Sequence, residues 1–172
     1  MTAPLTLADL SGMDQPAFVA ALDGIYEHSP WVAAGAWAAR PFASLPALAA
    51  ALEAVMLAAE PAQQLALIRA HPELAGRAAI AGELTAASSS EQQGAGLLQC
   101  SPAEFARLQA LNAAYHQRFG FPFVVAVRGL SRQAIIEQLA TRLQATPQDE
   151  QRTALQQIAR IAGWRLADRV AG

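Results

Sequence analysis

His71 is the residue of this sequence best suited to transfer a proton, because a free imidazole titrates close to neutral pH. It lies in the motif HPELAGR, directly before Pro72. A residue that precedes proline is disfavoured in helical conformation, so we expect His71 at the end of a helix, with its side chain projecting away from the helices toward a cleft. The same position also fits a surface histidine that only ends a helix.

A second group of polar side chains follows in the motif SSSEQQ. It contains Ser88, Ser89, Ser90, Glu91 and Gln92. We interpret the serines as a polar loop that leads into a helix N-terminus, where free N–H groups and hydroxyls can bind a carboxylate, imide or urea oxygen. The structural alternative is that Ser88 or Ser89 caps the helix and Glu91 complements its dipole.

One segment, Phe121 to Val127, is rich in β-branched and aromatic residues and is predicted to be extended. Its last five residues are Phe123, Val124, Val125, Ala126 and Val127. Their backbone groups have no obvious sheet partner, so some can hydrogen-bond a ligand. Arg128 ends the run, where a guanidinium can make a paired contact with a carboxylate. A surface salt bridge is the alternative for this arginine.

Other chemistry is excluded or disfavoured by residue types. The sequence contains no lysine, which excludes Schiff-base catalysis and lysine-anchored pyridoxal phosphate. A single cysteine, Cys100, excludes an intrachain disulfide and a multi-cysteine metal site. The three histidines lack metal-ligand spacing, so we predict no metal. His28 either joins the site or ends a helix, and His116 is expected on a solvated helix face.

These candidates must be positioned by helices. The chain has 172 residues, of which 53% are hydrophobic, with much alanine, and 15% are charged. This composition predicts one all-α domain over residues 1–172, with eight or nine helices and the extended segment near Phe121–Val127. The strongest helix-start signals are Asp14, Ser29–Pro30, Ser44, Pro61, Ser101, Ser131 and Thr146.

The charge and the termini predict where the protein works. A net charge of −2 gives no basic surface for nucleic acid or anionic lipid. The N-terminal residues MTAPLTLADL lack the basic start and apolar stretch of a signal peptide. No apolar run reaches the roughly 20 residues of a membrane span. We therefore predict a cytoplasmic protein that binds neither nucleic acid nor membrane.

Five motifs, in chain order, closely resemble the OHCU decarboxylase family, where OHCU is 2-oxo-4-hydroxy-4-carboxy-5-ureidoimidazoline. They are YEHSPW, HPELAGR, SSSEQQGAGL, LNAAYHQRFGFPF and VRG. The resemblance extends from about Leu10 to Trp164. It implies an all-helical, usually dimeric enzyme that releases CO₂ from OHCU and forms (S)-allantoin, the last step from urate to allantoin. It also implies that no cofactor is needed.

The resemblance also implies roles for the candidate residues. His71 would be the proton donor and Glu91 the catalytic carboxylate, with Ser88 and Gln92 as substrate contacts. Pro72 and the Phe123–Val127 backbone would line the pocket, and Arg128 would be the cationic contact. One departure is His116, where the family often has lysine, and it lies outside the pocket motifs.

Two other functions are compatible with the same residues. The pocket can serve an acid–base isomerase or hydratase of a small heterocycle, which would retain the carboxyl carbon in its product. It can also belong to a helical binding module for a small heterocycle, in which the histidine and glutamate only end and cap helices. Neither alternative accounts for five motifs in the same order.

Overall fold

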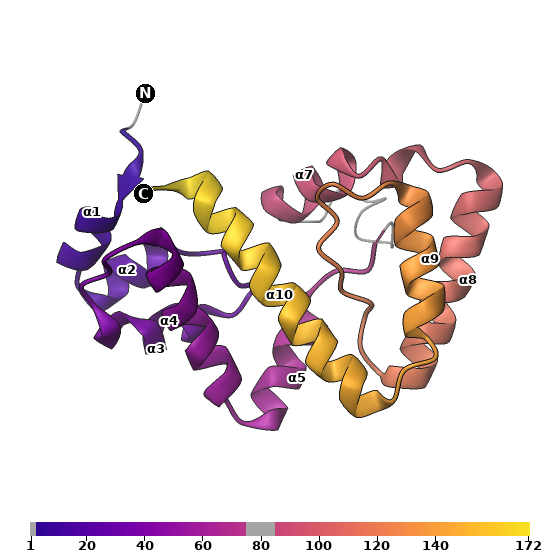
Figure 1. The fold of residues 1–172 in the computed structure, drawn as a ribbon, viewed down its shortest axis with the longest axis horizontal. Coiled ribbons are helices and arrows are strands. Elements are labelled where there is room, and N and C mark those ends of the chain that lie inside the picture. Colours follow the sequence, from indigo (N-terminus) through magenta and orange to yellow (C-terminus); the bar gives the residue numbers. More distant parts are fainter. Residues whose placement is uncertain (1–2, 75–84) are drawn as a thin grey trace. The chain divides into compact units, whose positions relative to one another are not determined.

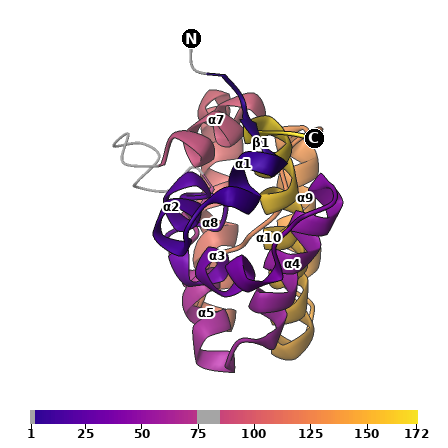
Figure 2. The same ribbon diagram turned by 90° about the vertical axis from the view of Figure 1, so that its left-hand side faces the viewer.

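The computed structural model describes residues 3–74 and 85–172. Within these residues the chain forms nine α-helices and two short 3-10 helices (Figure 1). The strands are β1, Leu5–Thr6, and β2, Val170–Ala171, which pair in parallel with Leu5 opposite Val170. Figure 2 shows β1 beside the C-terminal end of the chain. The all-α prediction is confirmed, although the two-residue strands were not predicted.

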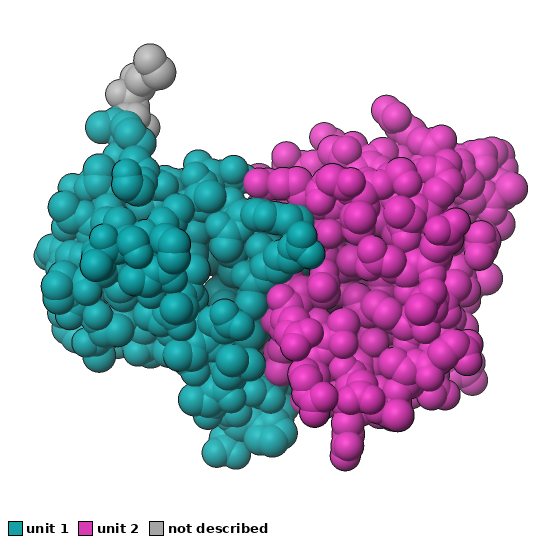
Figure 3. Space-filling model, viewed as in Figure 1, with its two compact units in different colours: residues 1–67, 159–172 teal, residues 68–158 magenta. Residues whose placement is uncertain are grey.

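The chain divides into two compact units, residues 1–67 with 159–172 and residues 68–158 (Figure 3). The first contains α1 (Leu7–Gly12), α2 (Gln15–Ala21), α3 (Pro30–Ala36), η1 (Trp37–Ala39), α4 (Leu45–Ala58) and most of α5 (Pro61–Ala70). The second contains α7 (Ala86–Gly94), η2 (Leu97–Gln99), α8 (Pro102–Phe119) and α9 (Arg132–Arg142). The long helix α10 (Pro147–Arg169) contributes residues to both units.

Helix starts follow the capping signals of the sequence. The side chains of Asp14, Ser44, Ser101 and Ser131 each accept a hydrogen bond from the backbone N–H three residues ahead, at the starts of α2, α4, α8 and α9. Such a bond satisfies one of the N–H groups that the first helical turn leaves without a partner. Ser29 is the exception, because its hydroxyl donates to the Glu27 carbonyl at 2.9 Å. Local signals therefore place most of the helices.

Close packing of the first unit depends on residues of α3 and α4. Leu48, Leu52 and Met56 form the buried face of α4. Gly35 of α3 permits the close approach, because a Cβ atom there would lie 2.7 Å from a methyl group of Val55. Among the described helices, none alone has the length and apolar composition of a membrane span; α4 and α5, bent by 119° at their junction, meet both criteria only as a pair.

The motif YEHSPW contributes a buried ion pair to the first unit. Glu27 accepts a 2.7 Å hydrogen bond from the Arg165 guanidinium, and the two side chains are 1% and 4% exposed. Arg165 also donates to the Gly24 carbonyl at 2.8 Å. The adjacent His28 is exposed and has a φ of 47°. Glu27 therefore ties the turn before α3 to the end of α10.

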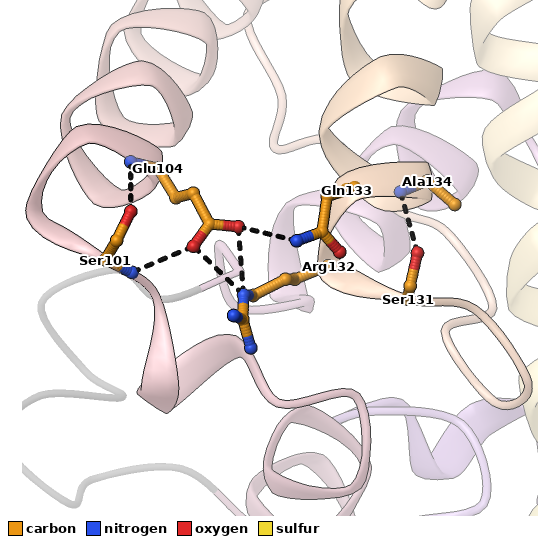
Figure 4. A network of polar contacts seen from close by, with 6 residues as sticks. All are labelled: Ser101, Glu104, Ser131, Arg132, Gln133 and Ala134. Atoms are coloured by element: carbon orange, nitrogen blue, oxygen red, sulfur yellow. Dashed lines mark hydrogen bonds and ion pairs between the residues drawn. The ribbon is translucent and has the colours of Figure 1, made fainter.

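In the second unit, Glu104 joins the starts of α8 and α9 (Figure 4). Its carboxylate accepts from the Ser101 N–H at 3.0 Å and from Arg132 Nε at 2.9 Å. The Gln133 amide donates to the same carboxylate at 3.1 Å. The hydrogen bond from the Ser101 N–H and, to a smaller extent, that from the Arg132 side chain hold the pKa of Glu104 below its ordinary value of 4.5. A carboxyl with a lowered pKa stabilises the folded state at pH values above its unfolded pKa.

Glu104→Gln is therefore expected to destabilise the protein near neutral pH and to matter less in acid. The stabilisation by Glu104 is lost as the pH falls through its lowered pKa, so the urea midpoints of the two proteins should converge below a pH of 4.5. Urea titrations at about pH 7 and about pH 3 measure this convergence. A difference in midpoint that stays constant with pH would contradict the role of the carboxylate charge.

Candidate active site

His71 directly follows α5, as the proline signal predicted. The last residue of the helix is Ala70, and the His71 N–H donates to the Ile68 carbonyl at 3.2 Å. The side chain of His71 is only 7% exposed, so His71 is not the surface histidine of the alternative interpretation. The segment that follows is held against α8, where buried Asn112 donates to the Leu74 carbonyl at 3.0 Å.

The serine motif lies inside α7 and not in a loop before it. Thr85 is the N-cap, and its hydroxyl accepts from the Ser88 N–H at 3.2 Å. Two alanines follow Thr85, and alanine favours helix more than any other residue. The prediction of a polar loop at Ser88–Glu91 is therefore wrong, as is capping by Ser88 or Ser89.

The helical position of these residues decides which of them are buried. Ser88 and Gln92 are four residues apart, so they share one face of α7, and they are 4% and 3% exposed. Ser89 and Glu91 are half-buried, and Ser90 is exposed. A sequence search for apolar periodicity misses this buried face, because its members are polar.

A hydrogen bond brings the serine motif and the histidine motif together. The Gln92 amide donates to the Glu73 carbonyl at 3.4 Å, so the buried face of α7 meets the segment that carries His71 and Pro72. Pro72 and Glu73 are half-buried. The two motifs are far apart in the sequence, and their contact places a buried imidazole and buried neutral polar side chains in one part of the second unit.

The segment 121–127 is buried at every residue but forms neither helix nor strand. Three of its backbone groups bond to the protein itself. The Val124 carbonyl accepts from Arg142 Nη1 at 2.6 Å, the Ala126 N–H donates to Gln157 Oε1 at 2.9 Å, and the Val127 carbonyl accepts from the Leu130 N–H at 3.0 Å. As expected, none of these three partners belongs to a sheet, since two are side chains and the third closes a turn. Arg128, directly after it, is exposed.

A buried polar network that the sequence did not predict lies beside this segment. The Tyr115 hydroxyl donates to Glu150 Oε1 at 2.5 Å, and Arg142 Nε donates to the same oxygen at 2.6 Å. Tyr115 and Glu150 are 0% and 1% exposed. Burial and, to a smaller extent, the hydrogen bond to Glu150 hold the pKa of Tyr115 above its ordinary value. The tyrosine therefore remains a protonated donor over the pH range in which proteins usually work.

No local pattern could have revealed this network. Glu150 follows the helix-start signal at Thr146 and resembles any acidic residue in a first helical turn. Its partner Tyr115 is 35 residues away in the chain.

Within residues 3–74 and 85–172, no three His, Cys, Asp or Glu side chains lie close enough to hold a metal ion. The cofactor-free reaction stays a prediction.

The structure thus defines an all-α protein in which the segment that carries a buried histidine meets a buried polar helix face. Comparison with known proteins identifies the family. The profile of the OHCU decarboxylase family matches residues 11–167. The chain belongs to the OHCU decarboxylase family, as its motifs predicted.

Two similar relatives match almost end to end. The 2-oxo-4-hydroxy-4-carboxy-5-ureidoimidazoline decarboxylase of Haloferax volcanii is 42% identical over 165 residues, which cover 96% of each chain. The decarboxylase of the same name from Mus musculus is 41% identical over 164 residues, covering 95% of this chain and 92% of the relative.

Two solved structures are similar in fold. The crystal structure of an (S)-allantoin synthase has a TM-score of 0.77 and 32% identity, and the match covers 98% of this chain and 54% of that one. This chain therefore spans about half the length of that synthase. The crystal structure of an OHCU decarboxylase in the presence of (S)-allantoin has a TM-score of 0.69 over 84% of this chain, and at 19% identity it supports the fold alone.

Proposed function

We propose that this chain catalyses the decarboxylation of OHCU to (S)-allantoin in urate degradation. The observation that carries the proposal is the end-to-end match to the Haloferax volcanii decarboxylase, at 42% identity over 96% of both chains. The family places the chain among the carboxy-lyases. The contact between Gln92 and the segment after His71 supports the assignment, because it joins two of the motifs that carry the resemblance.

The reaction needs a place for the electron pair that the broken bond leaves behind. When the carbon–carbon bond to the carboxylate breaks, CO₂ departs and its bonding pair stays on a ring carbon of the substrate. The chain has no lysine with which to form an imine as an electron sink. We therefore assign the sink to the conjugated ring atoms of OHCU itself. The protein would contribute orientation and electrostatic stabilisation.

His71 is the proposed donor of the proton that completes the reaction. Its proton would pass to the ring carbon as that carbon's electron pair forms the new C–H bond. Because His71 is 7% exposed, delivery would come from one fixed direction, and protonation of one face yields one enantiomer. Glu91 is proposed to hold the ureidoimidazoline so that the bond to the carboxylate stands perpendicular to the ring.

The remaining assignments concern binding. Ser88 and Gln92, which are buried on α7, are proposed as direct substrate contacts. Arg128, which is exposed and directly follows the buried segment, is proposed as the cationic contact. The other proposed lining groups are Pro72, Ser89, Ser90 and the backbone of Phe123, Val124, Val125, Ala126 and Val127.

We extend the proposal to the whole chain and its assembly. The family profile runs through both compact units, which supports one functional domain over residues 1–172. The family resemblance supports a homodimer that works without a cofactor, and we propose that this dimer works in the cytoplasm. Sedimentation velocity tests the dimer, and a species of 18.1 kDa at micromolar concentration would count against it.

The activity can be tested with substrate generated in place. Urate, urate oxidase and hydroxyisourate hydrolase supply unstable OHCU, and circular dichroism follows the optical activity of the product with and without this chain. We expect rapid formation of (S)-allantoin. Racemic allantoin at the spontaneous rate would contradict the proposal and favour the binding module. A product that retains the carboxyl carbon would favour the isomerase.

A further inference from the structure

We propose that Arg142 and Gln157 are positioning residues, which hold the backbone of segment 121–127 in the place where it contacts the substrate. The inference rests on the proposed function, because that function makes the Phe123–Val127 backbone a wall of the substrate site. It goes further by proposing that two side chains, one on α9 and one on α10, fix the position of these backbone groups. Neither side chain is itself a proposed substrate contact.

The segment depends on side chains because it has no regular secondary structure. All seven residues from 121 to 127 are buried, yet none belongs to a helix or a strand. A helix or a sheet ladder fixes each backbone group through a neighbouring backbone group, and a buried group without such a partner is costly. Apart from the turn in which the Leu130 N–H donates to the Val127 carbonyl, the partners that replace a ladder come from α9 and α10.

Arg142 holds a backbone carbonyl group of the segment, that of Val124. Its Nη1 atom donates to the Val124 carbonyl at 2.6 Å, and its guanidinium lies 4.5 Å from the centre of the Phe123 ring. The guanidinium is in turn held by Glu150, which also accepts the Tyr115 hydroxyl. An arginine fixed by a buried carboxylate has little freedom to move, so the carbonyl that it binds is held in place.

Gln157 holds a backbone N–H group of the segment, that of Ala126, two residues after Val124. Its Oε1 atom accepts from the Ala126 N–H at 2.9 Å. Gln157 is half-buried on α10, in the same compact unit as the segment. With one carbonyl bound by Arg142 and one N–H bound by Gln157, the segment is attached at two points on either side of Val125. Releasing either point would let the wall shift.

A shifted wall would change substrate binding more than folding. Backbone groups bind a ligand only at hydrogen-bond distance, and a displacement of about 1 Å can cost about 100-fold in rate. Gln157 makes one neutral hydrogen bond from a half-buried position, so its loss should leave the fold intact. Gln157 therefore separates positioning from stability better than Arg142, whose charge is part of the buried network.

The test compares three variants of the full chain. Gln157→Ala removes the acceptor, Gln157→Glu keeps an oxygen acceptor at the same reach, and Gln156→Ala is the matched control. Gln156 is the exposed neighbour on the same helix. The measurements are the KM for OHCU generated in place, the Kd of (S)-allantoin by calorimetry, and the hydrogen exchange rate of the Ala126 amide. Because partial unfolding would also raise the apparent KM and Kd, far-ultraviolet circular dichroism first establishes that each variant is fully folded.

We expect Gln157→Ala to raise KM and Kd by about 10- to 100-fold and to speed exchange at Ala126. Gln157→Glu should recover most of the affinity, and Gln156→Ala should behave as the unmodified protein. If the Ala126 amide exchanges equally fast in Gln157→Ala and the control, or if KM and Kd stay unchanged, the inference is wrong while the proposed function stands. An unmodified protein that neither turns over OHCU nor binds (S)-allantoin would overturn the proposed function, and with it the role of the wall.

Discussion

His71→Asn is expected to reduce decarboxylation to nearly the spontaneous rate and to replace (S)-allantoin by the racemate. A positioned acid typically contributes about 100- to 10,000-fold to the rate of a proton transfer. Asparagine has a side chain of comparable polarity but cannot donate an acidic proton at neutral pH. Without His71, water would protonate the ring carbon from either face. The coupled assay with urate, urate oxidase and hydroxyisourate hydrolase measures both rate and optical activity.

His116→Asn is the matched control for this prediction. His116 lies on α8 with its side chain exposed, so the same substitution there should change neither rate nor enantiomeric excess. Far-ultraviolet circular dichroism of both variants establishes that their helices are intact. Retention of near-normal rate and stereochemistry by His71→Asn would remove the histidine from its proposed role and direct attention to another donor.

Glu91→Gln, measured in the same assay, separates holding the substrate from proton donation. If Glu91 only holds the ureidoimidazoline, the amide should weaken binding while the product remains (S)-allantoin. Loss of stereochemistry equal to that of His71→Asn would show that the carboxylate takes part in proton transfer itself. Glu91 is half-buried on α7, so the isosteric amide leaves its packing unchanged.

Among the variants proposed for this protein, Glu150→Ala is expected to lose the most stability, about 3–5 kcal/mol in the free energy of unfolding. Glu150 is 1% exposed and accepts from both Arg142 and Tyr115. Its removal leaves a largely buried guanidinium without its carboxylate and a buried hydroxyl without its acceptor. Urea titration followed by circular dichroism measures the loss.

Glu137→Ala is the control for this stability prediction. Glu137 lies on α9 with its side chain exposed, and substitutions at such positions usually change stability by less than about 0.5 kcal/mol. Glu150→Gln should fall between the two, because the amide oxygen still accepts the Tyr115 hydroxyl but cannot balance the charge of Arg142. Equal losses in Glu150→Ala and Glu137→Ala would mean that the buried network does not stabilise the second unit.

Sequence alone determined the features that depend on neighbours within one helical turn. Asp14, Ser44, Ser101 and Ser131 start helices by bonding to N–H groups three residues ahead, a distance that is visible in the sequence. His71–Pro72 ends α5 for an equally local reason. The order of the five motifs predicted the family, and the end-to-end comparisons confirmed it.

Only the tertiary structure decided which polar groups are buried and what they bind. The sequence predicts a loop at the serine motif, because its buried positions, Ser88 and Gln92, lack the apolar residues that mark a core face. Tyr115 and Glu150 meet across 35 residues, and Glu27 and Arg165 across 138. The strength of such contacts depends on low-dielectric surroundings and on a geometry that exist only after the helices have packed, so no spacing in the sequence encodes them.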